Sequence, residues 1–393
     1  MCLFERYARK CGESFVKKCV VVSDSFKGTL SSSEICGIAS ECFAQELPDC
    51  SLCLLPVADG GEGTVECFVQ ACGAEPVAVD VSGPYFEPIT AVYAKLGSDT
   101  AVIEMAAAAG LTLVGDQKNP AKTTTYGVGQ LIRHAVEQGC TKVILGLGGS
   151  ATNDGGCGCA AALGVIFTDA AGEAFVPVGE TLNRIKAIDR RAAVELLHGV
   201  ELILMSDVKY PMHGENGAAY IFGPQKGADA QMVRFLDEQL KKFDCIVKQQ
   251  LGKQIADRQG AGAAGALGAG CMAFFDAEMR SGIETALELV GLDRHLEDCD
   301  LVITGEGQLD RQSLNGKVIS GVLEHTCPRG IPTIAIVGAV EDEIYEQAYA
   351  LGLSAVFSIN RRPEPFEQSR LHSHDNYRRT LTNLLRLLRA YQF

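Results

Sequence analysis

Residues 142–156 pass from an apolar run into glycines and small polar side chains, a pattern typical of an anion-binding loop. Residues 142–147 (KVILGL) have strand character, and the small residues 157–163 that come after the loop predict a helix. Backbone N–H groups at such a strand-to-helix connection bind phosphate or carboxylate groups. We therefore predict a phosphate site in this loop, whose residues are Gly148, Gly149, Ser150, Ala151, Thr152, Asn153 and Asp154. The alternative is a tight connection that binds no ligand.

Two nucleotide-binding templates fit this loop incompletely. No lysine follows the glycines, so the segment is not a Walker A loop. Gly146, Gly148 and Ala151 fit the spacing of the dinucleotide fingerprint, and Asp169 lies about where a ribose-binding acid is expected. A nicotinamide-dependent dehydrogenase therefore remains an alternative. Against it, the Asn-Asp-Gly-Gly run that starts at Asn153 delays the helix that should begin inside the fingerprint.

Polar residues also follow three other runs that have the pattern of buried strands. These runs are residues 19–23, 52–57 and 301–304, and a capping box formed by Ser31 and Glu34 predicts a helix after the first of them. The residues after the three runs are Asp24, Ser25 and Lys27, then Asp59, Gly60, Gly61 and Glu62, and finally Glu306 and Asp310. Because ligands of a parallel α/β sheet bind beyond the carboxyl ends of its strands, we expect these residues to share one rim.

The order of the elements predicts an α/β protein with two domains. Strand, glycine loop and helix alternate at the start of the chain and again after residue 299, which predicts a parallel sheet with crossover helices. The pattern changes after residue 83. We predict an N-terminal extension (1–18), a discontinuous parallel-sheet domain (19–82 and 292–393) and an inserted α/β domain (83–291).

Composition excludes several classes of partner. The 393-residue chain has 49 acidic and 35 basic residues and a net charge of −14, which argues against a nucleic-acid partner. Its 16 cysteines, without the pattern of a secretory signal, indicate a reducing compartment and predict a cytoplasmic location. No run reaches the roughly 18 apolar residues of a membrane span, so we expect no membrane partner.

The inventory of polar residues favours phosphoryl transfer. Glycine loops donate hydrogen bonds to phosphate oxygens, carboxylates hold Mg²⁺ or accept a hydroxyl proton, and lysines bind anionic groups. The middle of the chain adds Asp207, at the end of an apolar run, and Lys226, in a glycine-rich loop. Glu104 lies within an apolar strand pattern, where an unpaired charge is costly, so we expect it to be paired or functional. A serine hydrolase is disfavoured because the chain has no Gly-x-Ser-x-Gly motif.

Seven segments in chain order resemble the bacterial type I glycerate kinase family. They are SDSFKGTLS from residue 23, PVADGGEGTV from 56, IEMAAA from 103, GGSATNDGG from 148, FGPQKGA from 222, GAGAAG from 260 and ITGEG from 303. The resemblance implies a flavodoxin-like doubly wound domain interrupted by a second, mixed-sheet α/β domain similar to a restriction-endonuclease core. It also implies ATP-dependent phosphorylation of D-glycerate, usually at the 2-hydroxyl, to give 2-phosphoglycerate.

This interpretation gives each candidate residue an expected role. Asp310 is predicted to take the hydroxyl proton, with Lys27 and Asp207 completing the catalytic set. The predicted substrate-binding residues are Asp24, Ser25, Lys27, Asp59, Gly60, Gly61, Glu62 and Glu104. The ATP phosphates are assigned to the loop 148–154 with Lys226, Glu306 and Lys317, and Mg²⁺ is assigned to Asp154 and Asp207.

Two positions depart from the family pattern. Tyr210 stands where the family usually has an asparagine, and Gln308 stands where an arginine usually follows Gly-Glu-Gly. A lost arginine removes a bidentate contact to phosphate or carboxylate. The alternatives are therefore phosphorylation at the 3-hydroxyl, another small hydroxy acid as substrate, or a homologue that binds glycerate without catalysis. We expect a monomer or a homodimer.

Overall fold

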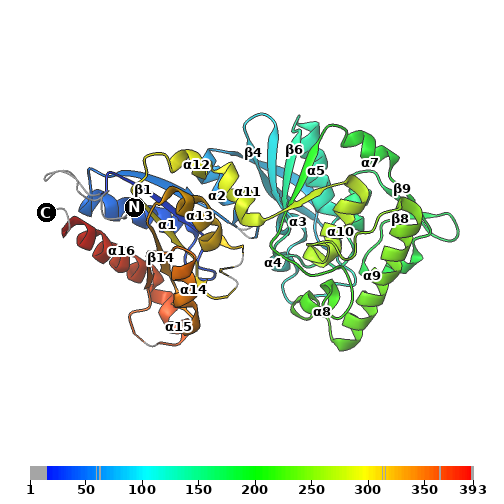
Figure 1. Cartoon of the computed structure of the whole chain (residues 1–393). Helices are drawn as coiled ribbons and strands as arrows, with labels where there is room; N and C mark the ends of the chain where they lie inside the picture. The colour runs from blue at the N-terminus through cyan, green and yellow to red at the C-terminus, as the bar shows by residue number, and fades with distance from the viewer. Residues whose placement is uncertain are drawn as a thin grey trace. The chain divides into compact units, whose positions relative to one another are not determined.

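The computed structural model of the chain describes residues 16–58, 60–61, 63–311, 313–314, 316–362 and 364–390. The chain divides into two compact units (Figure 1). The first unit is discontinuous and contains residues Met1–Ala58 and Ala286–Phe393, and the second contains Asp59–Thr285. None of the described helices combines the length and the apolar composition that a bilayer span requires.

A five-stranded parallel sheet forms the centre of the first unit. Its strands are β1 (Lys18–Ser23), β2 (Ser51–Pro56), β12 (Leu301–Gly305), β14 (Thr333–Val337) and β16 (Ala355–Ser358). They lie in the order β16-β14-β12-β1-β2, which is the flavodoxin-like order 2-1-3-4-5 when the strands are numbered along the chain. A short pair, β13 (Gln308–Leu309) with β15 (Ala339–Val340), extends the connections beyond β12 and β14.

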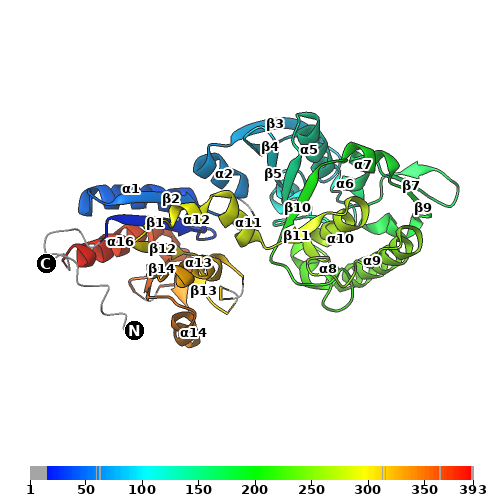
Figure 2. The same ribbon diagram turned by 45° about the horizontal axis from the view of Figure 1, so that its top comes forward.

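Alternating side chains of this sheet supply two apolar layers. Ile334 and Ile336 of β14 join the cluster that contains α1 (Ser32–Glu46) and α16 (Ser373–Ala390), whereas Ala335 and Val337 join the cluster on the other face. That second cluster contains α13 (Val318–Thr326) and α14 (Tyr345–Ala350). Helices α1 and α16 pack side by side (Figures 1 and 2). Shorter helices complete the unit: α12 (Leu292–His295) and α15 (Phe366–Ser369), with α11 (Gly282–Leu289) crossing the boundary between the units.

The start of α1 follows the sequence prediction closely. Ser31 is the N-cap, and its side-chain oxygen accepts a hydrogen bond from the N–H of Glu34 at 3.1 Å. The Glu34 carboxylate in turn accepts one from the N–H of Ser31 at 2.7 Å. This reciprocal pair satisfies two backbone donors that a helix start otherwise leaves without partners.

The second unit is built on a six-stranded mixed sheet. Its order is β11-β10-β6-β5-β4-β3. Strands β5, β6, β10 and β11 are parallel, and β4 and β3 are added antiparallel at one edge. The strands are β3 (Glu75–Ser82), β4 (Pro88–Leu96), β5 (Thr100–Glu104), β6 (Lys142–Gly146), β10 (Glu201–Met205) and β11 (Glu278–Arg280). A small separate sheet contains β7 (Ile166–Thr168), β8 (Ala174–Phe175) and β9 (Ala187–Asp189).

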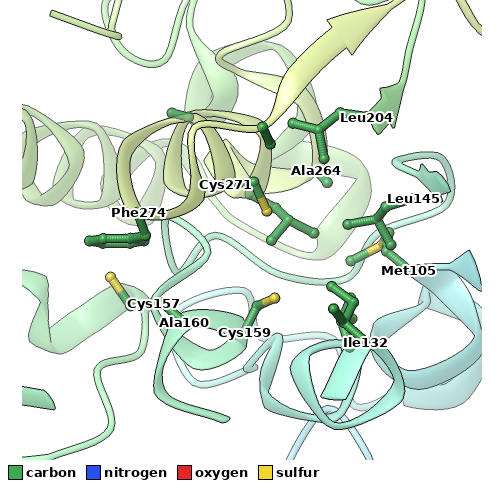
Figure 3. Packing of buried hydrophobic residues seen from close by; sticks show 14 of the residues in the cluster. Met105, Ile132, Leu145, Cys157, Cys159, Ala160, Leu204, Ala264, Cys271 and Phe274 are labelled. Atoms are coloured by element: carbon green, nitrogen blue, oxygen red, sulfur yellow. The ribbon is translucent and has the colours of Figure 1, made fainter. Parts of the chain in front are cut away.

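Small side chains let the helices of the second unit approach its sheet and one another. The helices are α2 (Thr64–Cys72), α3 (Ala106–Ala109), α4 (Leu111–Val114), α5 (Tyr126–Glu137), α6 (Cys157–Ala162), α7 (Arg191–Leu196), α8 (Ala218–Phe222), α9 (Ala230–Leu251) and α10 (Ala263–Phe275). Figure 3 shows part of the core, in which Leu145 of β6, Ile132 of α5, Cys159 of α6 and Cys271 of α10 belong to one apolar cluster. A Cβ at Gly129 of α5 would lie 2.3 Å from the carbonyl oxygen of Cys159, so only glycine permits this approach.

The predicted fold class is confirmed, but the predicted domain boundary is wrong. We expected residues 59–82 in the first domain and a boundary after Ser82. The structure places residues 59–285 together because β3 pairs with β4 along its whole length, so the expected boundary falls in the turn of a hairpin. Strand β3 is an edge strand with alternating exposed side chains, and nothing in such a pattern states which sheet the strand joins.

Candidate functional site

In the first unit, the parallel pairing of β1 with β12 brings two carboxylates to the same edge of the sheet. Ser23 lies opposite Gly305, so Asp24 and Glu306 are the first residues beyond their strands. The N–H of Asp24 donates to the carbonyl oxygen of Gly305 at 3.0 Å. Both residues are buried: Asp24 is 8% exposed and Glu306 is 5% exposed. The predicted shared rim of Asp24 and Glu306 is therefore present.

Lys317 connects the carboxylates of this edge. Its Nζ lies 3.8 Å from Glu306 Oε2 and 3.8 Å from Asp310 Oδ1. Asp310 Oδ1 also accepts hydrogen bonds from the N–H of Ser313 at 2.9 Å and from its Oγ at 3.1 Å. The site in the first unit is thus a group of acidic side chains with one shared cation, which is a suitable arrangement for moving a proton beside a phosphate group.

Burial gives Glu306 unusual acid–base behaviour. Desolvation raises the pKa of its carboxyl group from 4.5 to about 7, against the opposing effect of Lys317. The nearby charges of Asp24 and Asp310 contribute to the same rise. Its Oε1 atom is buried and has no hydrogen-bond partner among the described residues. A carboxylate whose pKa lies near neutrality is well matched to general-base catalysis.

The loop after β1 lies against the loop after β12. A Cβ built on Gly307 would lie 3.4 Å from Phe26 Cα and 3.5 Å from the nitrogen of Lys27. The Asp24 carboxylate accepts a hydrogen bond from the N–H of Ser25 at 2.6 Å, and the Lys27 side chain is exposed. The structure therefore brings the predicted residues of the two loops together.

In the second unit, the glycine loop after β6 is held on both sides by backbone hydrogen bonds. The N–H of Gly148 donates to the carbonyl oxygen of Gly60 at 3.1 Å, and the N–H of Ala151 donates to that of Ala109 at 2.9 Å. A Cβ on Gly148 would lie 2.6 Å from Gly61 Cα, so these backbones touch. The amides of Gly148 and Ala151 are thus used within the protein, and an anion would need other donors of the loop. Asp59 and Glu62, which flank the contacting glycines, lie outside the described residues.

Lys226 supports this loop from inside the protein. Lys226 is 2% exposed, and its Nζ donates to Ser150 Oγ at 2.7 Å and to the carbonyl oxygen of Thr152 at 2.8 Å. Desolvation lowers the pKa of its amine to about 7, although the charge of Asp154 acts in the opposite direction. Lys226 therefore fixes the shape of the loop through its side-chain contacts.

Asp154 is a fully buried carboxylate that binds backbone N–H groups at the start of α6. Its Oδ2 accepts from the N–H and Oγ1 of Thr125, both at 2.8 Å, and from the N–H of Gly158 at 3.2 Å. Its Oδ1 accepts from the N–H of Gly156 at 3.0 Å. Both oxygens are therefore engaged with protein donors at the start of α6, which favours a structural role for Asp154 over the Mg²⁺ ligation that we expected.

Glu104 is the last residue of β5 and Asp207 follows β10 in the same sheet, and both carboxylates bind neighbouring backbone N–H groups. Asp207 Oδ1 accepts from Ser281 Oγ at 3.1 Å and from the N–H of Gly282 at 3.0 Å. Glu104 Oε1 accepts from the N–H of Val65 at 2.7 Å, in the first turn of α2. Glu104 is therefore paired, as its place in an apolar strand required.

Comparisons with known proteins identify the family. The sequence profile described as the Glycerate kinase family matches residues 19–389. The chain is 42% identical to a glycerate kinase of Bacillus cereus over 369 residues, which cover 93% of this chain and 97% of that protein. It is 41% identical to the glycerate 2-kinase of Escherichia coli K12 over 370 residues, again 93% of this chain and 97% of the relative. The chain belongs to the glycerate kinase family.

A solved structure supports the same conclusion. A crystal structure from Salmonella typhimurium LT2, provisionally assigned as glycerate kinase 2, matches with a TM-score of 0.85 and 39% identity, covering 96% of this chain and 99% of that one. As a member of the glycerate kinase family the protein is an enzyme, a phosphotransferase with an alcohol group as acceptor.

Membership of the glycerate kinase family removes the reason to consider a dehydrogenase, and the geometry agrees. The helix that should open inside a dinucleotide fingerprint begins only at Cys157. Asp169, expected as a ribose-binding acid, lies in the turn between β7 and β8 and pairs with Arg184 at 3.0 Å. The spacing of Gly146, Gly148 and Ala151 therefore matched the fingerprint without its structural context.

Sequence reasoning missed the threonines that support the glycine loop. Thr123 Oγ1 donates to the carbonyl oxygen of Ala151 at 2.8 Å, and Thr125 Oγ1 binds Asp154 while accepting from the N–H of Cys159. All three residues of the Thr123–Thr125 run are 0% exposed. Three consecutive hydroxyls before an apolar helix were the available signal.

Proposed function

We propose that the protein transfers the γ-phosphoryl group of ATP in line to the 2-hydroxyl of D-glycerate, giving 2-phosphoglycerate. The observation that carries this proposal is the group of Glu306, Asp310 and Lys317 beside Asp24, at the carboxyl edge of a flavodoxin-like sheet. The Escherichia coli relative named as a glycerate 2-kinase supports the choice of hydroxyl.

Glu306 is the general base in this proposal, in place of Asp310. Its pKa of about 7 lets it exist as a carboxylate at neutral pH and still accept a proton as the hydroxyl attacks. Asp310 is engaged by Ser313 and Lys317, which suits a carboxylate that orients the lysine. Lys317 then faces the transferred phosphoryl group, and the exposed Lys27 binds the substrate carboxylate.

The nucleotide supplies the phosphoryl group, and its phosphates need donors from the chain. In the loop 148–154, Asn153 Nδ2 and Thr152 Oγ1 are buried and have no hydrogen-bond partner among the described residues. Such donors fit a phosphate oxygen, so the loop remains our proposed phosphate site with Lys226 as its internal support. For Mg²⁺ we retain Asp207, which is partly exposed at the end of β10, and we assign Asp154 to the fold.

Phosphorus NMR of the product tests the proposal directly. The full chain is incubated with ATP, Mg²⁺ and D-glycerate, and the ³¹P signal of 2-phosphoglycerate is expected together with ADP. A signal of 3-phosphoglycerate would show that the 3-hydroxyl is phosphorylated. Turnover of a different hydroxy acid in place of D-glycerate would show that D-glycerate is not the substrate. Thermal stabilisation by D-glycerate without ADP release would show a binding protein without kinase activity.

A further inference from the structure

A cavity of about 320 Å³ lies in the first unit, beyond the carboxyl end of β16. The loop that starts at Asn360 forms one side of it, and Ser369 of α15, His372 of the 3-10 helix η6 (Arg370–His372) and the first turns of α16 form the other. None of the residues to which we have given a role in the reaction lines this cavity.

The charged side chains that line the cavity leave an excess of positive charge. They are Arg361, Arg362, Arg379, His372, Glu364 and Asp375. Glu364 is in contact with Arg362 and neutralises it. Within the part of the chain that the structure describes, no carboxylate forms an ion pair with Arg361 or Arg379.

Two arginines without carboxylate partners around one cavity are informative in a chain of net charge −14. Both arginines line the cavity, together with the neutral donor Asn376. The planar fork of a guanidinium group binds two oxygens of one phosphate group at once, and its charge persists at every physiological pH. The cavity is therefore suited to a ligand with several anionic oxygens.

Hydrogen bonds link this cavity to the edge that carries the proposed base. Asn360 Nδ2 donates to the carbonyl oxygen of Gly338 at 2.8 Å. The N–H of Gly338 donates in turn to the carbonyl oxygen of Glu306 at 3.3 Å. Strands β12, β14 and β16 are successive neighbours, so the cavity lies about 10 Å along the same edge, two strand spacings from Glu306.

We propose that this cavity binds the phosphate groups of a small phosphorylated molecule through Arg361 and Arg379. The chemistry is the same for a nucleotide and for a phosphorylated hydroxy acid, and the two are separated by the experiment below. The proposal concerns binding alone and does not depend on which residue acts as the base.

Isothermal titration calorimetry of the full chain tests this site with three probes: ADP, 2-phosphoglycerate and inorganic phosphate. The variant is the double substitution Arg361→Gln and Arg379→Gln, and the matched control is Arg191→Gln, which changes a 90% exposed arginine of the second unit. Each lost charge-assisted contact weakens binding by about tenfold or more, so the double variant should bind its ligand about 100 times more weakly or worse. Circular dichroism spectra should be the same for all three proteins.

The outcomes separate the two sources of phosphate. Weakened binding of ADP alone assigns the cavity to the nucleotide, and weakened binding of 2-phosphoglycerate with unchanged ADP affinity assigns it to the phosphorylated acid. The proposal is overturned if the wild-type chain binds none of the three probes, if the double variant keeps all affinities within twofold, or if Arg191→Gln weakens binding equally. If the wild-type chain shows no kinase activity, the proposed function is contradicted, but the comparison of ligand affinities between the wild type and the double variant is unaffected.

Discussion

Replacement of Glu306 by glutamine should make the protein more stable and strongly reduce its activity. The glutamine keeps the shape of the side chain but has no charge to desolvate. A carboxyl pKa that rises from 4.5 to about 7 on folding corresponds to roughly 3 kcal/mol. The Glu306 side chain is 7% exposed, so solvent screening removes little of this amount.

The effect has a definite pH dependence. Because the pKa is higher in the folded chain, the folded state binds more protons between about pH 4.5 and 7, and its stability falls as the pH rises through this range. The gain in Glu306→Gln should therefore approach roughly 3 kcal/mol at pH 8 and stay below about 1 kcal/mol at pH 5. For a unit of this size the larger value raises the melting temperature by about 5 °C or more.

Differential scanning calorimetry at pH 5 and pH 8 measures this gain, and an ADP-release assay measures activity. The matched control is Glu343→Gln, whose side chain is 81% exposed and pairs with Arg311 at the surface. That control should change stability by less than about 0.5 kcal/mol at either pH. Loss of a general base should reduce kcat by about 10²- to 10⁴-fold. Equal melting temperatures of Glu306→Gln and wild type at pH 8, or full activity of the variant, would refute the reasoning.

Three further substitutions test the glycine loop and its supports. Lys226→Met should reduce kcat more than tenfold. A lysine pKa lowered to about 7 makes the melting temperature of the wild type rise between pH 7 and 10, and the variant should lose this rise. A melting temperature that still rises in the variant would contradict the prediction. Asp154→Asn should destabilise the second unit by about 2 to 4 kcal/mol in urea unfolding, because an amide nitrogen would face backbone N–H donors. Normal stability with a changed Mg²⁺ requirement would instead support Asp154 as a ligand of Mg²⁺. Gly148→Ala should lower the free energy of unfolding by about 2 kcal/mol, because the added Cβ meets Gly61. The control is Gly37→Ala, inside α1 with open space around it, which should raise the free energy of unfolding by up to about 1 kcal/mol. Equal melting temperatures of the two variants would count against the contact between Gly148 and Gly61.

The local elements of the fold were predictable because their signals lie in neighbouring residues. The apolar run 19–23 forms β1, and Ser31 with Glu34 forms the capping box of α1. The parallel sheet also followed from the alternation of strands and helices, since crossover connections place parallel strands beside one another, whereas the flavodoxin-like strand order was implied by the resemblance to the family. The boundary between the units was not predictable, because β3 joins its sheet by pairing with β4, which in turn pairs with β5.

The residue types of the sites were also predictable, but their roles were not. Spacing identified Asp154 and Lys226 as unusual polar residues in glycine-rich loops, yet their contacts show that both support the loop from inside the protein. Asp310 and Glu306 are equally acidic in sequence. Only burial distinguishes them, because removal from water raises the pKa of Glu306.

The sequence by itself determined the family, the parallel α/β architecture and the set of polar side chains available for phosphoryl transfer. The tertiary structure decided which of those side chains are exposed, which are engaged by the backbone, and which arginines gather around a common cavity. The physical reason is that strand periodicity and capping act over a few residues, whereas desolvation and charge pairing depend on atoms brought together from distant parts of the chain.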